Sequence, residues 1–208
     1  MGRDLFLKYI MKKILTGLSA IILFAACSTP PQKKVVVMAS GKLVVSGDGV
    51  TIEPGTQHNE ETINIKGDKL TLSGPDGNKD FPITETGTFL LNLKKDTLIG
   101  GFQPFGEATS REGRITQEQL MERMDSLQQL MMGSNVAVEK RNHFLAPGEM
   151  KKITPADNAI LVGPFKGMPA SLTPDKNGKV PEVYKFITNK DARETLGRLE
   201  KMLKAEGE

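Results

Sequence analysis

The chain has 208 residues, with 28 Lys and Arg against 25 Asp and Glu and a formal net charge of +3. It contains one Cys, no Trp and two Tyr. A single cysteine excludes an intrachain disulfide scaffold and a zinc site built on several thiolates. The scarcity of Trp and Tyr argues against a glycan-binding platform, because such platforms stack sugars on these rings.

The N-terminus has the layout of an export signal. Lys12 and Lys13 precede an apolar run over residues 14–26. A helix rises about 1.5 Å per residue and needs roughly 20 residues to cross the hydrocarbon core, so this run is too short for a stable span. A basic start, a short apolar core and small residues at the exit are typical of secretory signals. Translation starts at Met1 or Met11, and the sequence favours Met11, which directly precedes the basic patch.

The exit of this segment reads Leu23-Phe24-Ala25-Ala26-Cys27 and resembles the lipobox of bacterial lipoproteins. The resemblance implies that residues 1–26 are a lipoprotein signal peptide cleaved between Ala26 and Cys27. It further implies a diacylglyceryl thioether on Cys27 and an acyl chain on its new amino group. Phe24 departs from the aliphatic residue usual at that position. An uncleaved amphipathic anchor is the alternative, but the only cysteine lies at the one position that the signal requires, which favours lipidation.

Processing changes the charge of the protein. Residues 1–26 carry four basic residues and one acidic residue, so the mature part retains 24 of each and has a net charge near zero. Proteins that bind nucleic acid or an acidic membrane surface through phosphates need clustered Lys and Arg. The sequence therefore predicts no nucleic-acid partner.

The mature chain is expected to be an α+β protein whose N-terminal unit is an antiparallel β-sandwich. Residues 27–34 are polar and proline-containing and are predicted to be the lipidated cysteine and a tether. Short β-branched runs separated by Gly, Pro, Asp and Asn follow over residues 35–106, a spacing typical of sandwiches or meanders. The expected strands are 35–38, 42–45, 50–52, 62–65, 70–72, 81–83, 88–93 and 97–99.

A mixed region with two amphipathic helices is expected over residues 107–208. Thr116 and Gln119 form a capping box for a helix over 117–132, and Gly133 is a natural stop. A second helix is expected over 190–205, capped by Thr188 or Asn189. Each helix has an apolar seam with spacings of four, three and four, so the two should pack on each other or on one sheet face. The candidate strands of this region are 136–138, 151–153, 159–162 and 182–187.

For each residue that could bind a metal or a phosphate group, a purely structural role explains the sequence better. His58 lies among Gln, Asn and Glu, but consecutive side chains on a loop diverge, so a solvated loop tip is favoured over a metal site. The spacing of Asp76, Asn78 and Asp80 starts like a calcium loop and then lacks the required Gly and Glu. Gly100 and Gly101 are not followed by the Lys of a phosphate-binding loop. No metal or cofactor is therefore expected.

Two segments are candidates for binding. Asn142, His143 and Phe144 could line a pocket, although such a stretch is more often an ordered loop over the core. The helix over 117–132 carries several Met residues and could offer an adaptable groove to a partner, with ordinary core packing as the alternative.

Residues 87–93, 96–98 and 181–186 resemble envelope lipoproteins of Bacteroidota-type bacteria that have no assigned activity. The resemblance transfers no functional residue beyond Cys27. It does imply a location, because the residues after Cys27 are not acidic, which in such bacteria favours the periplasmic face of the outer membrane.

The leading hypothesis is a non-catalytic protein-interaction or binding module, held in the bilayer by acylated Cys27 and acting on an envelope protein in the periplasm. A small-ligand-binding lipoprotein is the second possibility, with residues 142–144 as its wall. A hydrolase using carboxylates ranks third, because no catalytic constellation supports it.

Overall fold

The computed structural model describes residues 32–55, 58–74, 77–104, 116–134, 136, 140–176 and 178–206. Gln32–Glu208 forms one compact unit, and its described residues make an α+β fold of twelve strands and two helices. The strands are β1 (Lys33–Ala39), β2 (Lys42–Ser46), β3 (Gly49–Glu53), β4 (Asn59–Ile65), β5 (Lys69–Gly74), β6 (Gly77–Pro82), β7 (Gly87–Leu93), β8 (Leu98–Gln103), β9 (Asn142–Leu145), β10 (Met150–Thr154), β11 (Ile160–Val162) and β12 (Val183–Thr188). The helices are α2 (Gln117–Met131) and α3 (Asn189–Glu206).

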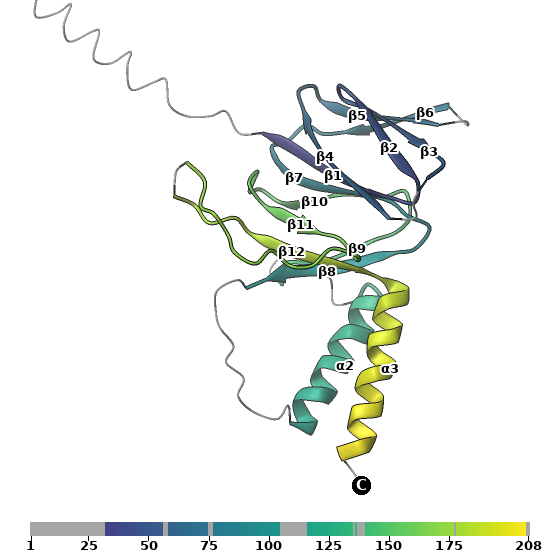
Figure 1. Cartoon of the computed structure of the whole chain (residues 1–208), viewed down its shortest axis with the longest axis vertical. Coiled ribbons are helices and arrows are strands. Elements are labelled where there is room, and N and C mark those ends of the chain that lie inside the picture. The colour runs from purple at the N-terminus through teal and green to yellow at the C-terminus, as the bar shows by residue number, and fades with distance from the viewer. Residues whose placement is uncertain are drawn as a thin grey trace, which may run out of the picture. The chain divides into compact units, whose positions relative to one another are not determined.

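The strands form three sheets of four strands, and Figure 1 shows them as successive layers. Their orders are β2-β3-β5-β6, β10-β7-β1-β4 and β11-β12-β8-β9. The expectation of antiparallel pairing in the N-terminal unit is wrong for two pairs, because β3 and β5 run parallel, as do β1 and β7. In the C-terminal region, β11 and β12 also run parallel. Parallel partners need a long connection. The connection between β1 and β7 contains β4, which joins the same sheet, and β2, β3, β5 and β6, which build another sheet.

The central sheet is buried on both faces. In β1, Val35 and Val37 pack into a core shared with the β2-β3-β5-β6 sheet. The alternate residues Val36 and Met38 pack into a second core shared with the β11-β12-β8-β9 sheet. Successive strand side chains point to opposite faces, so a strand covered on both sides requires the continuous apolar run that β1 carries.

The expected boundary near residue 106 does not separate the sheets. Strand β10 pairs with β7, and β8 pairs with both β9 and β12. Strands from both halves of the chain therefore complete the same two sheets.

The two helices pack on each other as an antiparallel pair against the third sheet, and Figure 1 shows them projecting from it. The predicted capping box is confirmed: Thr116 Oγ1 accepts from the Gln119 N–H and Gln119 Oε1 accepts from the Thr116 N–H, both at 3.3 Å. Gly133 follows the helix with a φ of 71°, the left-handed conformation that ends helices. At α3 the cap is Thr188, whose Oγ1 accepts from the Asp191 N–H at 3.1 Å.

Several expected elements have different bounds. Residues 142–145, expected as a loop, form strand β9, and β1 begins inside the expected tether at Lys33. The candidate strand over 136–138 lies mostly outside the described residues. Within the described part of the chain, neither helix has the length and apolar character needed to cross a membrane.

Candidate functional site

Strand β9 separates the three predicted pocket residues. Asn142 lines a groove beneath α2, and Phe144 approaches the end of that helix, where a Cβ on Gly133 would lie 3.6 Å from its ring. His143 points to the opposite face, with its ring centroid 5.8 Å from that of Tyr184 and 6.2 Å from that of Phe186. Because side chains alternate along a strand, the three residues do not form one pocket wall.

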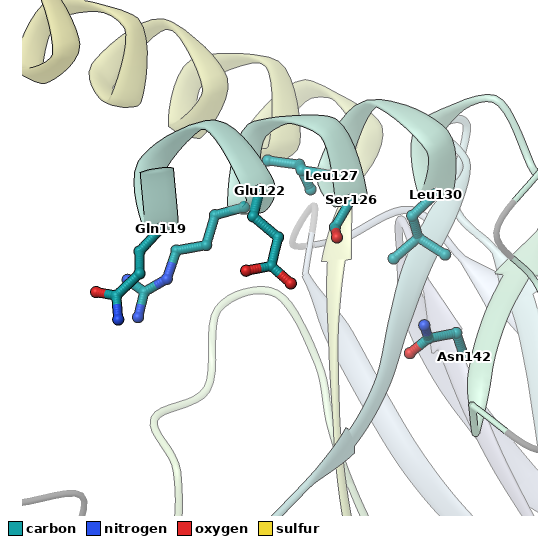
Figure 2. Close-up of a pocket in the computed structure, with 7 residues that line it drawn as sticks. Gln119, Glu122, Ser126, Leu127, Leu130 and Asn142 are labelled. Carbon is teal, nitrogen blue, oxygen red and sulfur yellow. The ribbon is translucent and has the colours of Figure 1, made fainter. Parts of the chain in front are cut away.

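A groove between α2 and β9 is the first candidate site, with a volume of about 530 Å³. Figure 2 shows the Gln119, Glu122, Ser126 and Leu130 side chains along one side of α2, with Asn142 below the Leu130 end of the helix. The lining residues are Gln119, Glu122, Arg123, Ser126, Leu127, Leu130 and Asn142. The groove thus combines two leucines with a rim that carries one charge of each sign.

The helical residues of this groove recur every three or four positions from Gln119 to Leu130. Positions at this spacing share one face of a helix, and a rise of about 1.5 Å per residue makes the lined face about 17 Å long. The lined face is therefore elongated and spans roughly three turns of α2.

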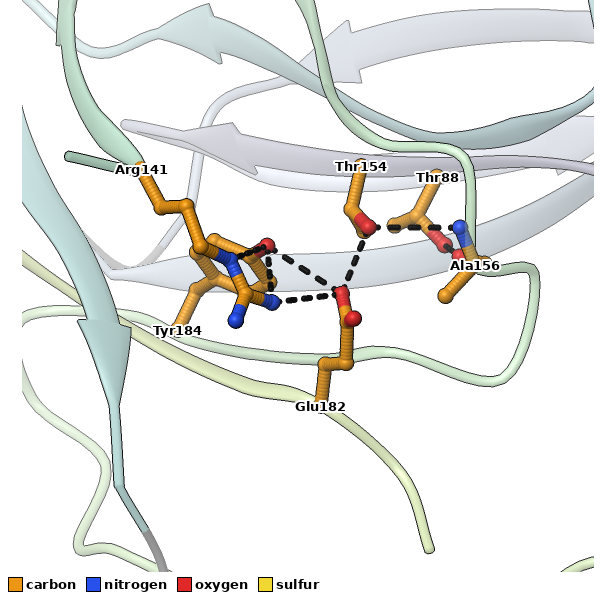
Figure 3. A network of polar contacts seen from close by, with 6 residues as sticks. All are labelled: Thr88, Arg141, Thr154, Ala156, Glu182 and Tyr184. Carbon is orange, nitrogen blue, oxygen red and sulfur yellow. Dashed lines mark hydrogen bonds and ion pairs between the residues drawn. The ribbon is translucent and has the colours of Figure 1, made fainter. Parts of the chain in front are cut away.

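A polar network at the start of β9 joins three strands of the chain (Figure 3). Arg141, directly before β9, donates from Nη2 to the Tyr184 hydroxyl at 2.7 Å and pairs with Glu182 Oε2 at 2.8 Å. Tyr184 and Thr154 also donate their hydroxyls to Glu182 Oε2, at 3.1 and 2.6 Å. Thr154 Oγ1 accepts from the Ala156 N–H at 3.2 Å. The network ties β9, β10 and β12 together.

Arg141 has a φ of 54°, a left-handed conformation that is uncommon outside glycine. Its guanidinium carbon lies 3.6 Å from the centroid of the Phe102 ring, in a cation–π contact. A cavity of about 240 Å³ adjoins this stack and is lined in part by Glu182. Partial burial alone would raise the pKa of Glu182, but the hydrogen bond from Thr154 and the charge of Arg141 outweigh burial and lower it.

His143 is held in its neutral form. Burial, with the charges of Lys151 and Arg141, lowers its pKa to about 4. Its Nε2 is buried without a hydrogen-bond partner. His143 is thus a partly buried residue that packs against the Tyr184 and Phe186 rings, and this placement does not support a role as a ligand.

A separate cavity of about 440 Å³ lies where the β7–β8 turn meets the start of α3. Its lining includes Lys94, Lys95 and Lys190, together with His58 and Phe165. His58 stacks on the Phe165 ring with centroids 3.4 Å apart. His58 is exposed, and it contributes to the wall of this cavity.

Gly100 and Gly101 lie in strand β8, beyond the end expected for that strand at residue 99, and serve strand packing. A Cβ on Gly100 would collide with the Lys185 carbonyl of β12, and one on Gly101 would collide with the Asn142 side chain of β9. Both glycines therefore permit the close pairing of β8 with its two neighbours. Among the described residues, no group of three or more His, Cys, Asp or Glu side chains could hold a metal.

Cys27 and Ala26 lie outside the described residues. No protein-family model, curated protein or solved structure matches this chain. The Arg141–Glu182 pair and the lysine-lined cavity were not anticipated from the sequence, because each joins residues that are distant along the chain and carry no local motif.

Proposed function

We propose that this chain is a lipid-anchored envelope protein that acts as a non-catalytic interaction module on the periplasmic face of the outer membrane. The lipobox-like exit at Cys27 supports the anchor and the compartment. The β-sandwich-like description of the N-terminal unit belongs to the same proposal. It is supported by the core that the central sheet shares with the sheet containing β2 and β3.

The groove between α2 and β9 is the proposed docking site, and its shape is the observation that carries the proposal. An elongated groove about 17 Å long suits an extended partner segment better than a compact small molecule. The Leu127 and Leu130 side chains offer an apolar floor, while Glu122 and Arg123 offer one charge of each sign at the rim.

The occupant that fits this groove is an amphipathic helix of a partner envelope protein. A helix lying in a groove places its apolar face on the floor and its flanking charges on the rim. Exposed Met side chains lie elsewhere on the helix pair, with Met121 51% exposed on α2 and Met202 46% exposed on α3, and neither lines the groove. Flexible Met side chains adapt readily to partner surfaces.

Site-specific photo-crosslinking in cells tests this proposal. A crosslinker at Arg123 in the groove should capture one partner, whereas a crosslinker at exposed Gln128 on the same helix should not. The variant Ser126→Trp fills the groove without removing a core side chain, so it should abolish capture from Arg123. A synthetic peptide spanning the crosslinked partner segment should gain helicity when it binds the full chain.

Identical products from Arg123 and Gln128, or capture that survives Ser126→Trp, would contradict a docking groove at this place. A crosslinked segment that binds without becoming helical would contradict the proposed occupant. The small-ligand alternative is favoured by a different observation, the lysine-lined cavity at the start of α3.

A further inference from the structure

The cavity at the start of α3 has an excess of cationic groups. Three lysines line it, and the acidic residues beside them are Asp96 and Asp191. The Asp96 carboxylate accepts from the backbone N–H of Thr97 at 2.8 Å and from that of Lys190 at 3.0 Å. Asp96 therefore already stabilises the first turn of α3, where the N–H groups lack partners within the helix.

Asp191 is engaged in a similar way. Its Oδ2 accepts from the Thr188 hydroxyl at 2.7 Å and from the Thr188 N–H at 3.2 Å. The third acidic group near the lysines, Glu60, forms an ion pair with Lys166 at 3.1 Å. These contacts fix the positions of the carboxylates, and the lining carries three lysines against two aspartates, which is one positive charge in excess.

Lys94 is a fixed cation in the lining of this cavity. The residue is only 6% exposed, and its Nζ donates to the Ala39 carbonyl at 3.2 Å. Its backbone N–H donates to the side chain of buried Asn92 at 3.0 Å. Burial lowers the pKa of Lys94, while the nearby carboxylates of Glu60 and Asp191 act to raise it. A cation held in this way loses little side-chain freedom when an anion binds.

An aromatic wall adjoins the lysines. Phe165 is 53% exposed, its ring stacks on His58 at an interplanar angle of 29°, and Lys94 Nζ lies 5.5 Å from the ring centroid. An exposed ring beside a cation offers a flat apolar face and a charge to the same ligand.

We propose that this cavity binds a small organic anion that carries a carboxylate or a phosphate next to a flat ring. Lys95 and Lys190 approach the anionic group from the cavity rim, Lys94 holds the inner position, and Phe165 packs against the ring. This site is separate from the α2–β9 groove, so it does not depend on the docking proposal.

Titration calorimetry on the full chain in a neutral detergent tests the site with three matched probes. Phenyl phosphate and benzoate supply the two candidate charges, and benzamide is the neutral counterpart. At least one anionic probe should bind with a Kd of about 1 mM or tighter, as expected for a ligand of this size. Benzamide should not bind measurably. The stronger anion identifies the ligand as a phosphate ester or a carboxylic acid.

Variants then locate the site. Lys95→Gln and Lys190→Gln should each weaken the anionic probe by about threefold to fivefold, the range for exposed charge pairs. Lys201→Gln removes the same charge from an exposed position further along α3 and should leave the Kd unchanged. Phe165→Ala should weaken phenyl phosphate but not inorganic phosphate. No binding of either anion, equal binding of benzamide, or an equal loss in Lys201→Gln would overturn the proposal.

Discussion

The guanidinium of Arg141 lies 2.8 Å from the carboxylate of Glu182, and the two side chains remain 34% and 29% exposed. The pair joins the residue before β9 to the residue before β12, two strands on either side of β8 in one sheet. A pair of this kind fixes the path of the chain between strands that are far apart in sequence.

Removing the cation from this pair should destabilise the fold. Arg141→Met leaves Glu182 without its charge partner and deprives the Tyr184 hydroxyl of two donors. Because the pair is only partly buried, we expect a loss of about 2 kcal/mol in the free energy of unfolding, below the cost for a fully buried pair. Urea denaturation measures this change.

The control for Arg141 is an exposed ion pair. Lys69 lies 2.6 Å from Asp80 with side chains 55% and 47% exposed, so solvent screens their attraction. Lys69→Met should change the urea midpoint little. An equal shift in both variants would contradict a special role for the Arg141 network.

His143 should make stability depend on pH. Its pKa falls from 6.5 to about 4 in the folded protein, mainly through burial. As pH falls through this window, the unfolded chain binds a proton that the folded chain does not, so the free energy of unfolding decreases. The urea midpoint should therefore be lower near pH 5 than near pH 7.5.

His143→Phe should remove most of this difference because the ring contacts persist without a titrating group. The lowered pKa of Glu182 affects stability only below its ordinary value of 4.5, which leaves the comparison near pH 5 informative. A midpoint that falls equally in the variant would assign the pH dependence to other groups.

Two glycines should respond to alanine in opposite directions. Gly100→Ala places a methyl group against the Lys185 carbonyl, where β12 pairs with β8, and should cost more than about 2 kcal/mol because the strands must separate. Gly197 lies within α3 with no heavy atom within 4 Å of an added Cβ. Gly197→Ala should instead stabilise by about 0.5 to 1 kcal/mol. Thermal denaturation of both variants checks the signs.

Among the polar residues of β7, replacement of Asn92 should lower the free energy of unfolding the most. It is fully buried, and its Nδ2 donates to the carbonyls of Asp96 at 2.9 Å and Leu145 at 3.0 Å. Asn92→Ala leaves buried backbone groups unpaired and should cost about 3 kcal/mol. The exposed Asn78→Ala is the matched control. A similar small change in both variants would show that water replaces the lost bonds.

Local features of the sequence predicted local structure well. Thr116 and Gln119 predict the start of α2 because a capping box is formed by two residues three positions apart, so it can be recognised in the sequence. The apolar run of β1 marks a buried strand. Strand β9 could not be recognised from the sequence because it lacks an alternation of apolar and polar residues. Asn142 and Phe144 face the helices, while His143 lies against aromatic core residues.

The candidate sites could not be derived in the same way. Lys94 and Lys190 line the same cavity because β8 pairs with β12, and this pairing brings the β7–β8 turn to the start of α3. Nothing in the sequence around Lys94 distinguishes a buried lysine from one in a solvated turn. The groove beneath α2 likewise depends on which strand lies under the helix, which is a property of the sheet order.

The identity of the mature N-terminus tests the central claim most directly. Intact-mass and peptide mass spectrometry of the protein extracted from its native membranes should show a chain that begins at Cys27 and carries added acyl mass, and Cys27→Ala should accumulate unprocessed. A membrane-bound chain that retains residues 1–26, or a mature chain with an unmodified Cys27, would contradict the account.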